Sequence, residues 1–131
     1  MTIRELQEYR FLQSESAALQ ARIWDLQNPY RSPQMTSSGG AHGNTPSDPT
    51  QDSAFKIIKE EEKLERMQTE IASRMIAIDN WLTTVESADT RTIIHWHYML
   101  GLTWNETARH MTIRMTGDNC RMIIKRYFEK K

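Results

Sequence analysis

The sequence predicts an all-α protein, in which a long helical hairpin or coiled-coil segment is followed by a C-terminal helix-turn-helix domain. Two segments carry apolar residues at helical spacing, and a stretch rich in proline and glycine separates them. The last third of the chain alternates short helical patterns with capping and turn residues. At 131 residues, the chain is expected to form one domain, or one domain with an extension.

Residues 1–28 are predicted to form an N-terminal amphipathic helix that ends before Pro29. Its apolar residues recur at a spacing near that of a heptad pattern, with Ser16 as a polar interruption. These apolar residues are Tyr9, Leu12, Leu19, Ile23 and Leu26. The spacing is typical of one strand of a coiled coil or helix bundle.

Residues 29–53 are predicted to be a flexible linker. All four prolines and three of the five glycines of the chain lie in this segment, among Ser, Thr, Asn and Gln. Such a composition offers too little apolar surface to order itself.

Residues 54–86 are predicted to form a long coiled-coil-like helix. Its heptad-like track comprises Ile57, Leu64, Met67, Ile71, Ile78, Trp81 and Val85. We expect this helix to pair antiparallel with the N-terminal helix. Its apolar width exceeds what one short partner needs, which favours a homodimer. The alternative is a monomeric bundle of three or four helices.

Residues 87–131 carry the pattern of the helix-turn-helix domain. Asp89-Thr90 is placed to cap a helix that runs to about Leu100, and Gly101 is placed to end it. Thr103 and Glu106 have the spacing of a capping box at the start of the next helix. A turn at residues 112–115 then leads to a last helix at about 117–129, which Thr116 or Asp118 can cap.

The last helix is predicted to have one apolar and one basic face. Winding it at about 100° per residue places Cys120, Ile123, Ile124 and Tyr127 on one side. The same winding places Asp118, Arg121, Met122, Lys125 and Arg126 on the other. The whole chain has no net charge, yet residues 112–131 hold six Lys or Arg and only two acidic residues. The positive charge is therefore concentrated at this end, as expected for a nucleic-acid-facing surface.

These motifs carry a family resemblance. The run from Gly101 to Ala108 resembles the Gly-Leu-Ser-Trp-x-Glu-Ile-Ala signature of sigma factor region 4-like domains. More closely, the chain resembles small phage and prophage proteins that end in such a domain, including the ArpU-like late transcription regulators. The run from Thr116 to Phe128 is similar to the C-terminal helix of that group. In it, Arg121, Lys125 and Arg126 match basic positions, and Cys120 and Ile123 match buried ones.

The resemblance and the basic helix together predict a phage-type, sequence-specific transcription regulator that binds double-stranded DNA. Base edges are assigned to Arg121, Lys125 and Met122, with Asp118 and Asn119 at the start of the same helix. Phosphates are assigned to Arg114, Arg126, Lys130 and the helix start at Thr103 and Trp104. Two alternatives remain: a protein-interaction module acting on RNA polymerase, and a small-terminase-like packaging component.

Chemistry of other kinds is not indicated by the sequence. His95 and His97 are about 200° apart on a helix, too far to share a metal, and with His110 they are read as surface histidines. No phosphate loop, nucleophile elbow or paired carboxylates point to an enzyme, a cofactor or a small-molecule substrate. The single cysteine, Cys120, is read as a core residue in a cytoplasmic protein. No apolar run reaches the length of a membrane span.

Overall fold

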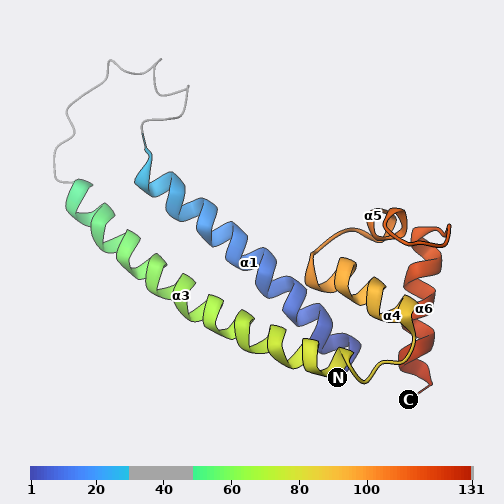
Figure 1. Cartoon of the computed structure of the whole chain (residues 1–131). Coiled ribbons are helices and arrows are strands. Elements are labelled where there is room, and N and C mark those ends of the chain that lie inside the picture. Colours follow the sequence, from blue (N-terminus) through green and yellow to red (C-terminus); the bar gives the residue numbers. More distant parts are fainter. Residues whose placement is uncertain (30–48, 131) are drawn as a thin grey trace, which may run out of the picture. The chain divides into compact units, whose positions relative to one another are not determined.

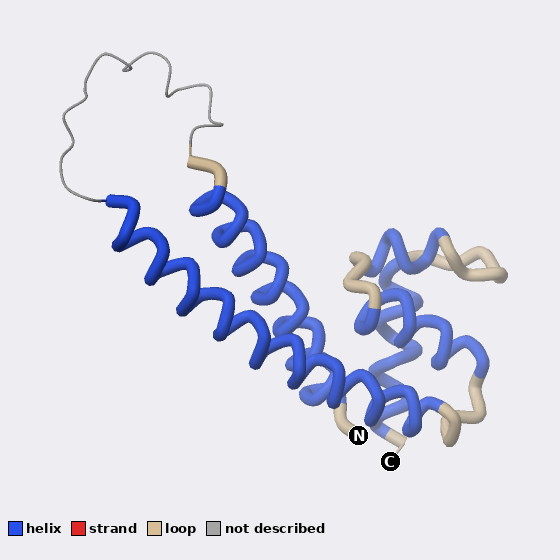
Figure 2. The backbone as a smooth tube through the Cα atoms, turned by 60° about the vertical axis from the view of Figure 1, so that its left-hand side comes forward, coloured by secondary structure: helices blue, strands red, loops and turns tan. Residues whose placement is uncertain are grey.

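The computed structural model describes residues 1–29 and 49–130, and every regular element among them is a helix (Figures 1 and 2). The predicted all-α class is therefore confirmed. The chain divides into two compact units. The first unit comprises Met1–Ser14 and Thr69–Lys131, and the second comprises Glu15–Gln68.

Two long helices contribute to both units. Helix α1 spans Ile3–Gln27 and agrees with the predicted N-terminal helix. Helix α3 spans Pro49–Leu82, whereas 54–86 was predicted. The helix therefore begins five residues before the predicted start, at Pro49. Proline is compatible with this position, because the first turn of a helix does not need its missing amide hydrogen. Of the predicted linker, residues 30–48 lie outside the described residues.

In the second unit, the α1 and α3 segments run antiparallel (Figure 1). Ser16, Leu19 and Ile23 are buried on α1, which matches the predicted track, including its polar interruption. Two polar contacts bridge the segments: Arg22 pairs with Glu60 at 3.4 Å, and the Gln27 amide donates to Glu61 at 3.4 Å. Exposed pairs of this kind contribute little stability, so the apolar track holds the unit together.

Helix α4 (Ala88–Ile93) continues directly into the π-helix η2 (Ile94–Met99). The cap of α4 is Ser87 instead of the predicted Asp89-Thr90, because the Ser87 hydroxyl accepts the Thr90 amide hydrogen at 3.3 Å. The wider turn of η2 brings the Leu100 amide to the His95 carbonyl at 3.0 Å. Gly101, with φ of +76°, then ends the helical run as predicted.

The remaining two helices are α5 (Trp104–Arg109) and α6 (Gly117–Glu129). The bounds of α6 confirm the predicted last helix. Six helices contribute to the core of the first unit, and the buried cluster contains Leu6, Tyr9, Ile78, Ile93, Ile94, Tyr98, Met99, Ala108, Cys120 and Ile124. The core thus joins the start of α1 and the end of α3 to the C-terminal helices. Arg74 of α3 links the two long helices within this unit by donating to Glu8 of α1 at 3.2 Å, and it also donates to Glu70 of its own helix at 3.1 Å.

Thr107 of α5 is fully buried. Among the described residues, its hydroxyl oxygen is the one fully buried side-chain polar atom without a hydrogen-bond partner. An unsatisfied buried hydroxyl lowers stability. We therefore expect Thr107→Val, which keeps the shape of the side chain, to raise the free energy of unfolding by about 1 kcal/mol in urea titrations. Thr92→Val is the control, because the Thr92 hydroxyl donates to the Ala88 carbonyl at 2.8 Å and its loss should not stabilise. A destabilised Thr107→Val variant would contradict this expectation.

Candidate nucleic-acid interface

The start of α5 is fixed by its own residues. The Thr103 hydroxyl accepts the Glu106 amide hydrogen at 3.1 Å, and the Glu106 carboxylate accepts the Thr103 amide hydrogen at 2.9 Å. This confirms the predicted capping box. The hydrogen bond from the Thr103 backbone is the main cause that lowers the pKa of Glu106. The carboxylate is therefore negatively charged at neutral pH and occupies the helix start that the sequence had suggested for a phosphate.

Helix α6 is seated on the start of α5 by a close backbone approach. Thr116 caps α6 by accepting the Asn119 amide hydrogen at 3.2 Å. Gly117 follows, and a Cβ at this position would lie 2.3 Å from the Asn105 side-chain oxygen and 3.0 Å from the backbone of Trp104 and of Asn105. Only glycine allows the two helices to come this close without a shift, so this contact fixes where α6 begins relative to α5.

The two faces of α6 differ in burial as predicted. Cys120 and Ile124 are buried, and Ile123 and Tyr127 are half-buried. Burial raises the pKa of the Cys120 thiol, with Asp89 as a second cause, which fits a core residue. The exposed residues of the helix include Asp118, Asn119, Arg121, Lys125 and Arg126. None of the three cations forms an ion pair with the described part of the chain.

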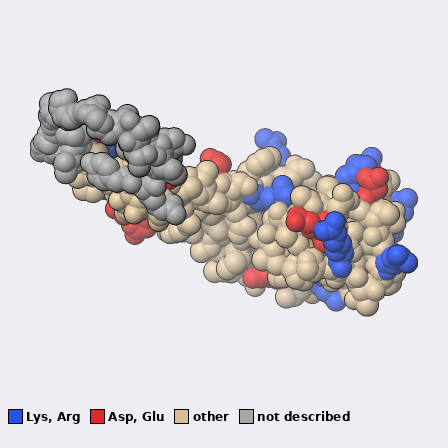
Figure 3. Space-filling view, turned by 90° about the horizontal axis from the view of Figure 1, so that it is seen from above, with Lys and Arg blue, Asp and Glu red and all other residues tan. Residues whose placement is uncertain are grey.

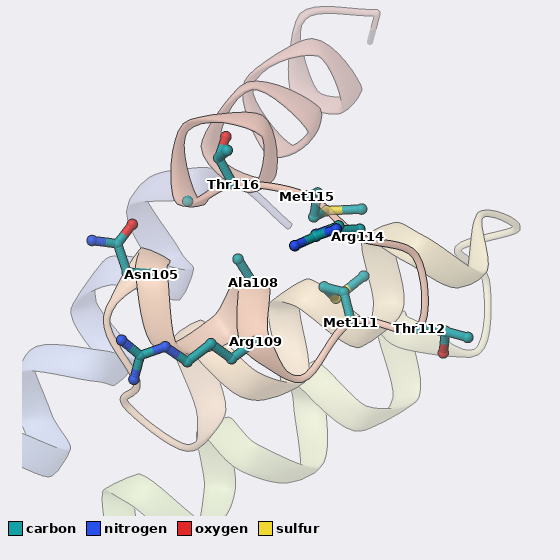
Figure 4. A pocket seen from close by; sticks show the side chains of 9 residues that line it. Asn105, Ala108, Arg109, Met111, Thr112, Arg114, Met115 and Thr116 are labelled. Carbon is teal, nitrogen blue, oxygen red and sulfur yellow. The ribbon is translucent and has the colours of Figure 1, made fainter.

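A hollow of about 600 Å³ lies between α5, the following turn and the start of α6 (Figure 4). Arg109 of α5 and Arg114 of the turn both line it, together with Asn105 and Thr116. Both arginines are exposed and make no ion pair with a described residue. In Figure 4, Arg109 extends on the Asn105 side of the hollow, and Arg114 lies near the methionines of the turn. The hollow therefore adds two cations beside the first turn of α6.

Sequence reasoning missed Arg109. It lies just before the segment in which the basic residues were counted, and its place beside Arg114 depends on the turn between the helices. Its position in the last turn of a helix was the available signal, because cations are common there.

Figure 3 shows Lys and Arg side chains on several sides of the part of the molecule that carries the C-terminal helices.

Two residues, Met122 and His97, are placed differently from the expectation, whereas Trp104 packs against the core as expected. Met122, expected on the open face, is half-buried. Trp104 is half-buried, and its ring stacks on His97 with centroids 3.6 Å apart. His97, expected at the surface, is only 7% exposed. The remaining predicted positions, Thr103, Arg114 and Lys130, are exposed.

Arg10 of α1 supports the segment that leads into α5. Its Nε donates to the His97 carbonyl at 3.1 Å, and its Nη2 donates to the carbonyls of Gly101 and Leu102, both at 3.3 Å. The Leu102 carbonyl also accepts Nδ1–H of His97 at 2.7 Å. Burial is the main cause that lowers the pKa of His97 to about 4, and the nearby charge of Arg10 acts in the same direction.

The lowered pKa of His97 predicts a pH-dependent stability. The unfolded chain takes up this proton near pH 6.5 and the folded chain only near pH 4. The stability from a neutral His97 is therefore complete above pH 6.5 and is lost as the pH falls through about 4, at about 1.4 kcal/mol per pH unit. Urea titrations from pH 7 to pH 4 measure this slope.

His97→Gln should flatten the slope in that window, because glutamine keeps a donor for the Leu102 carbonyl and does not titrate. His95→Gln is the matched control, since His95 is an exposed histidine of the same helix, and it should keep the slope. Equal slopes in the His97→Gln variant and the unmodified chain would rule out His97 as the titrating group.

Among the described residues, no group of three His, Cys, Asp or Glu side chains is placed to hold a metal ion. None of the described helices combines the length and apolar character needed to cross a membrane. Comparisons with protein-family models, curated proteins and solved structures found no match to this chain.

Proposed function

We propose that this chain is a sequence-specific, double-stranded DNA-binding transcription regulator, similar to the ArpU-like phage proteins that its motifs resemble. Helix α6 acts as the recognition helix of a helix-turn-helix formed with α5. The protein works in the cytoplasm of a bacterial host. The observation that carries the proposal is the exposed face of α6, on which Arg121, Lys125 and Arg126 have no acidic partner within the described chain.

The dimensions of α6 support this role. Its 13 residues give a rod of about 20 Å, which fits the major groove of B-DNA. Arg121 and Lys125 lie one turn apart and read base edges, with Asp118 and Asn119 on the first turn. Met122 offers its exposed part to a thymine methyl group.

Phosphate contacts fall to the cations at the two ends of the helix. Arg114 lies before its first turn, together with Arg109, and Arg126 and Lys130 lie at its last turn. Thr103 and Trp104 flank this surface at the start of α5. Because Glu106 already binds the Thr103 backbone there, the arginines carry more of the phosphate binding than that helix start does.

Selection from a random duplex library, followed by anisotropy titrations of the selected duplex, tests the proposal. We expect Arg121→Ala to weaken specific binding by about 1–3 kcal/mol, because a bidentate arginine–guanine pair is lost. Arg121→Ala/Lys125→Ala should abolish the preference for the selected duplex. Binding by the unmodified chain should weaken steeply with salt, since bound phosphates release counterions.

The matched control is Lys63→Ala/Arg66→Ala, which removes the same two residue types from exposed positions of α3 in the second unit. This control should bind as the unmodified chain does. Equal loss in both double variants, or binding without a preferred sequence, would refute the recognition role of α6. A protein surface such as that of RNA polymerase would then be the target to test.

We further propose that two copies pair through the second unit. Trp24, Phe55 and Ile58 of this unit are 44%, 61% and 51% exposed, and covering such large apolar side chains by a second copy would remove apolar surface from water. A dimer also suits the proposed function, because two-fold proteins read two half-sites on DNA.

Light scattering on the purified chain tests the pairing. The mass should be twice the 15.4 kDa of one chain, and Phe55→Glu/Ile58→Glu should return it to 15.4 kDa. Ile76→Glu is the control, because Ile76 is 58% exposed but belongs to the first unit. An unmodified chain of 15.4 kDa would refute the dimer, and a large ring would support a small-terminase-like role instead.

A further inference from the structure

A second hollow of the first unit, of about 250 Å³, lies between α1, η2 and the start of α5. Pockets for drug-sized ligands begin at about 300 Å³, so this one has the size for a single-ring molecule. Its lining residues are Gln7, Arg10 and Phe11 from α1, His97 and Tyr98 from η2, and Trp104 from α5. Four of the six carry aromatic or imidazole rings.

Arg10 brings an uncompensated positive charge to this hollow. Its Nε and Nη2 donate to three backbone carbonyls, whereas no hydrogen bond to a described residue involves Nη1. Within the described chain, no carboxylate pairs with the guanidinium. A half-buried cation that meets only carbonyl dipoles attracts an anion more strongly than an exposed one, because water screens it less. One donor nitrogen and an unpaired charge are therefore available on this wall.

Tyr98 supplies a second unused donor. The residue is only 3% exposed, but its hydroxyl oxygen is not among the fully buried atoms, and it makes no hydrogen bond to any residue that the structure describes. Burial raises the pKa of Tyr98, so the hydroxyl keeps its proton at neutral pH. The low pKa of His97 leaves that ring neutral, and its Nδ1–H is already used by Leu102.

The remaining walls suit a flat apolar group. Trp104 stacks on His97 and meets Tyr98 edge to face, with ring centroids 6.0 Å apart. Phe11 is 65% exposed and makes no ring contact within the described chain. It forms an open wall that a planar ligand would cover.

We propose that this hollow binds a small aromatic carboxylate, with its ring between Phe11 and Trp104 and its carboxylate at Arg10 and Tyr98. The charge and the two free donors select the carboxylate, and the rings and the volume select a single aromatic ring. The site is distinct from the exposed face of α6, so the proposal does not depend on DNA binding. A bound ligand joins α1 to the first turn of α5.

Titration of the full, isotope-labelled chain with benzoate, followed by NMR, tests the site. We expect saturable shifts of the Trp104 indole and of the His97 and Tyr98 amides. Benzamide has the same size but no charge, and it should bind roughly tenfold more weakly, because the hydrogen bonds to an ionised group are stronger. If benzoate shifted these signals no more than benzamide does, the hollow would not select a carboxylate, and that part of the proposal would be overturned.

Two variants separate binding from folding. Tyr98→Phe removes only the hydroxyl and should weaken benzoate binding roughly tenfold, while the spectrum of the free chain stays folded. Phe11→Ala should weaken it similarly, and Ile76→Ala is the control, because Ile76 is 58% exposed in the same unit but does not line the hollow. Unchanged benzoate affinity in both Tyr98→Phe and Phe11→Ala, or the absence of saturable shifts, would overturn the proposal.

Discussion

The C-terminal helices depend on one contact between distant parts of the chain, the binding of the Arg10 guanidinium to the carbonyls of His97, Gly101 and Leu102. These carbonyls lie at the end of η2 and in the bend after it, where the helical ladder leaves acceptors without partners. A side chain from α1 satisfies them, and His97 adds a second donor to Leu102. The path of the backbone into α5 is thus fixed by a residue about ninety positions earlier in the chain.

That constraint reaches the exposed face of α6 through two further contacts. Trp104 opens α5 and stacks on His97, so the beginning of α5 is held against η2. Gly117 opens α6 and touches the backbone of α5 at the same place. The first turn of α5 thus contacts η2 on one side and the first turn of α6 on the other. The direction in which Arg121 points is therefore set by packing that begins at α1, and residues 1–14 belong to the same compact unit as the proposed DNA-binding helices.

The sequence predicted well the features that local chemistry determines. The capping box of Thr103 and Glu106, the positive φ of Gly101 and the bounds of α6 all follow from short-range rules. The start of α3 at Pro49 was missed, because the polar residues 50–53 that follow this proline resemble the linker before it. The burial of His97 was not foreseen, since spacing along one helix does not show a partner such as Arg10. The hollow beside Tyr98 was missed for the same reason, because its walls come from three helices.

The two cationic sites of the first unit differ in how water and salt act on them. On α6, Arg121 and Lys125 are exposed to solvent. Dissolved ions therefore screen their attraction for an anion, which weakens as the ionic strength rises. Such a surface suits a long polyanion that supplies many weak contacts at once. At the other site, the charge of Arg10 is half-buried and lies beside neutral rings, where screening is weaker. A single carboxylate with a well-fitting ring suits that position, and it would bind with little dependence on salt. The two proposed anion sites thus differ because the exposed face of α6 is open to solvent, while α1 and η2 half enclose the charge of Arg10.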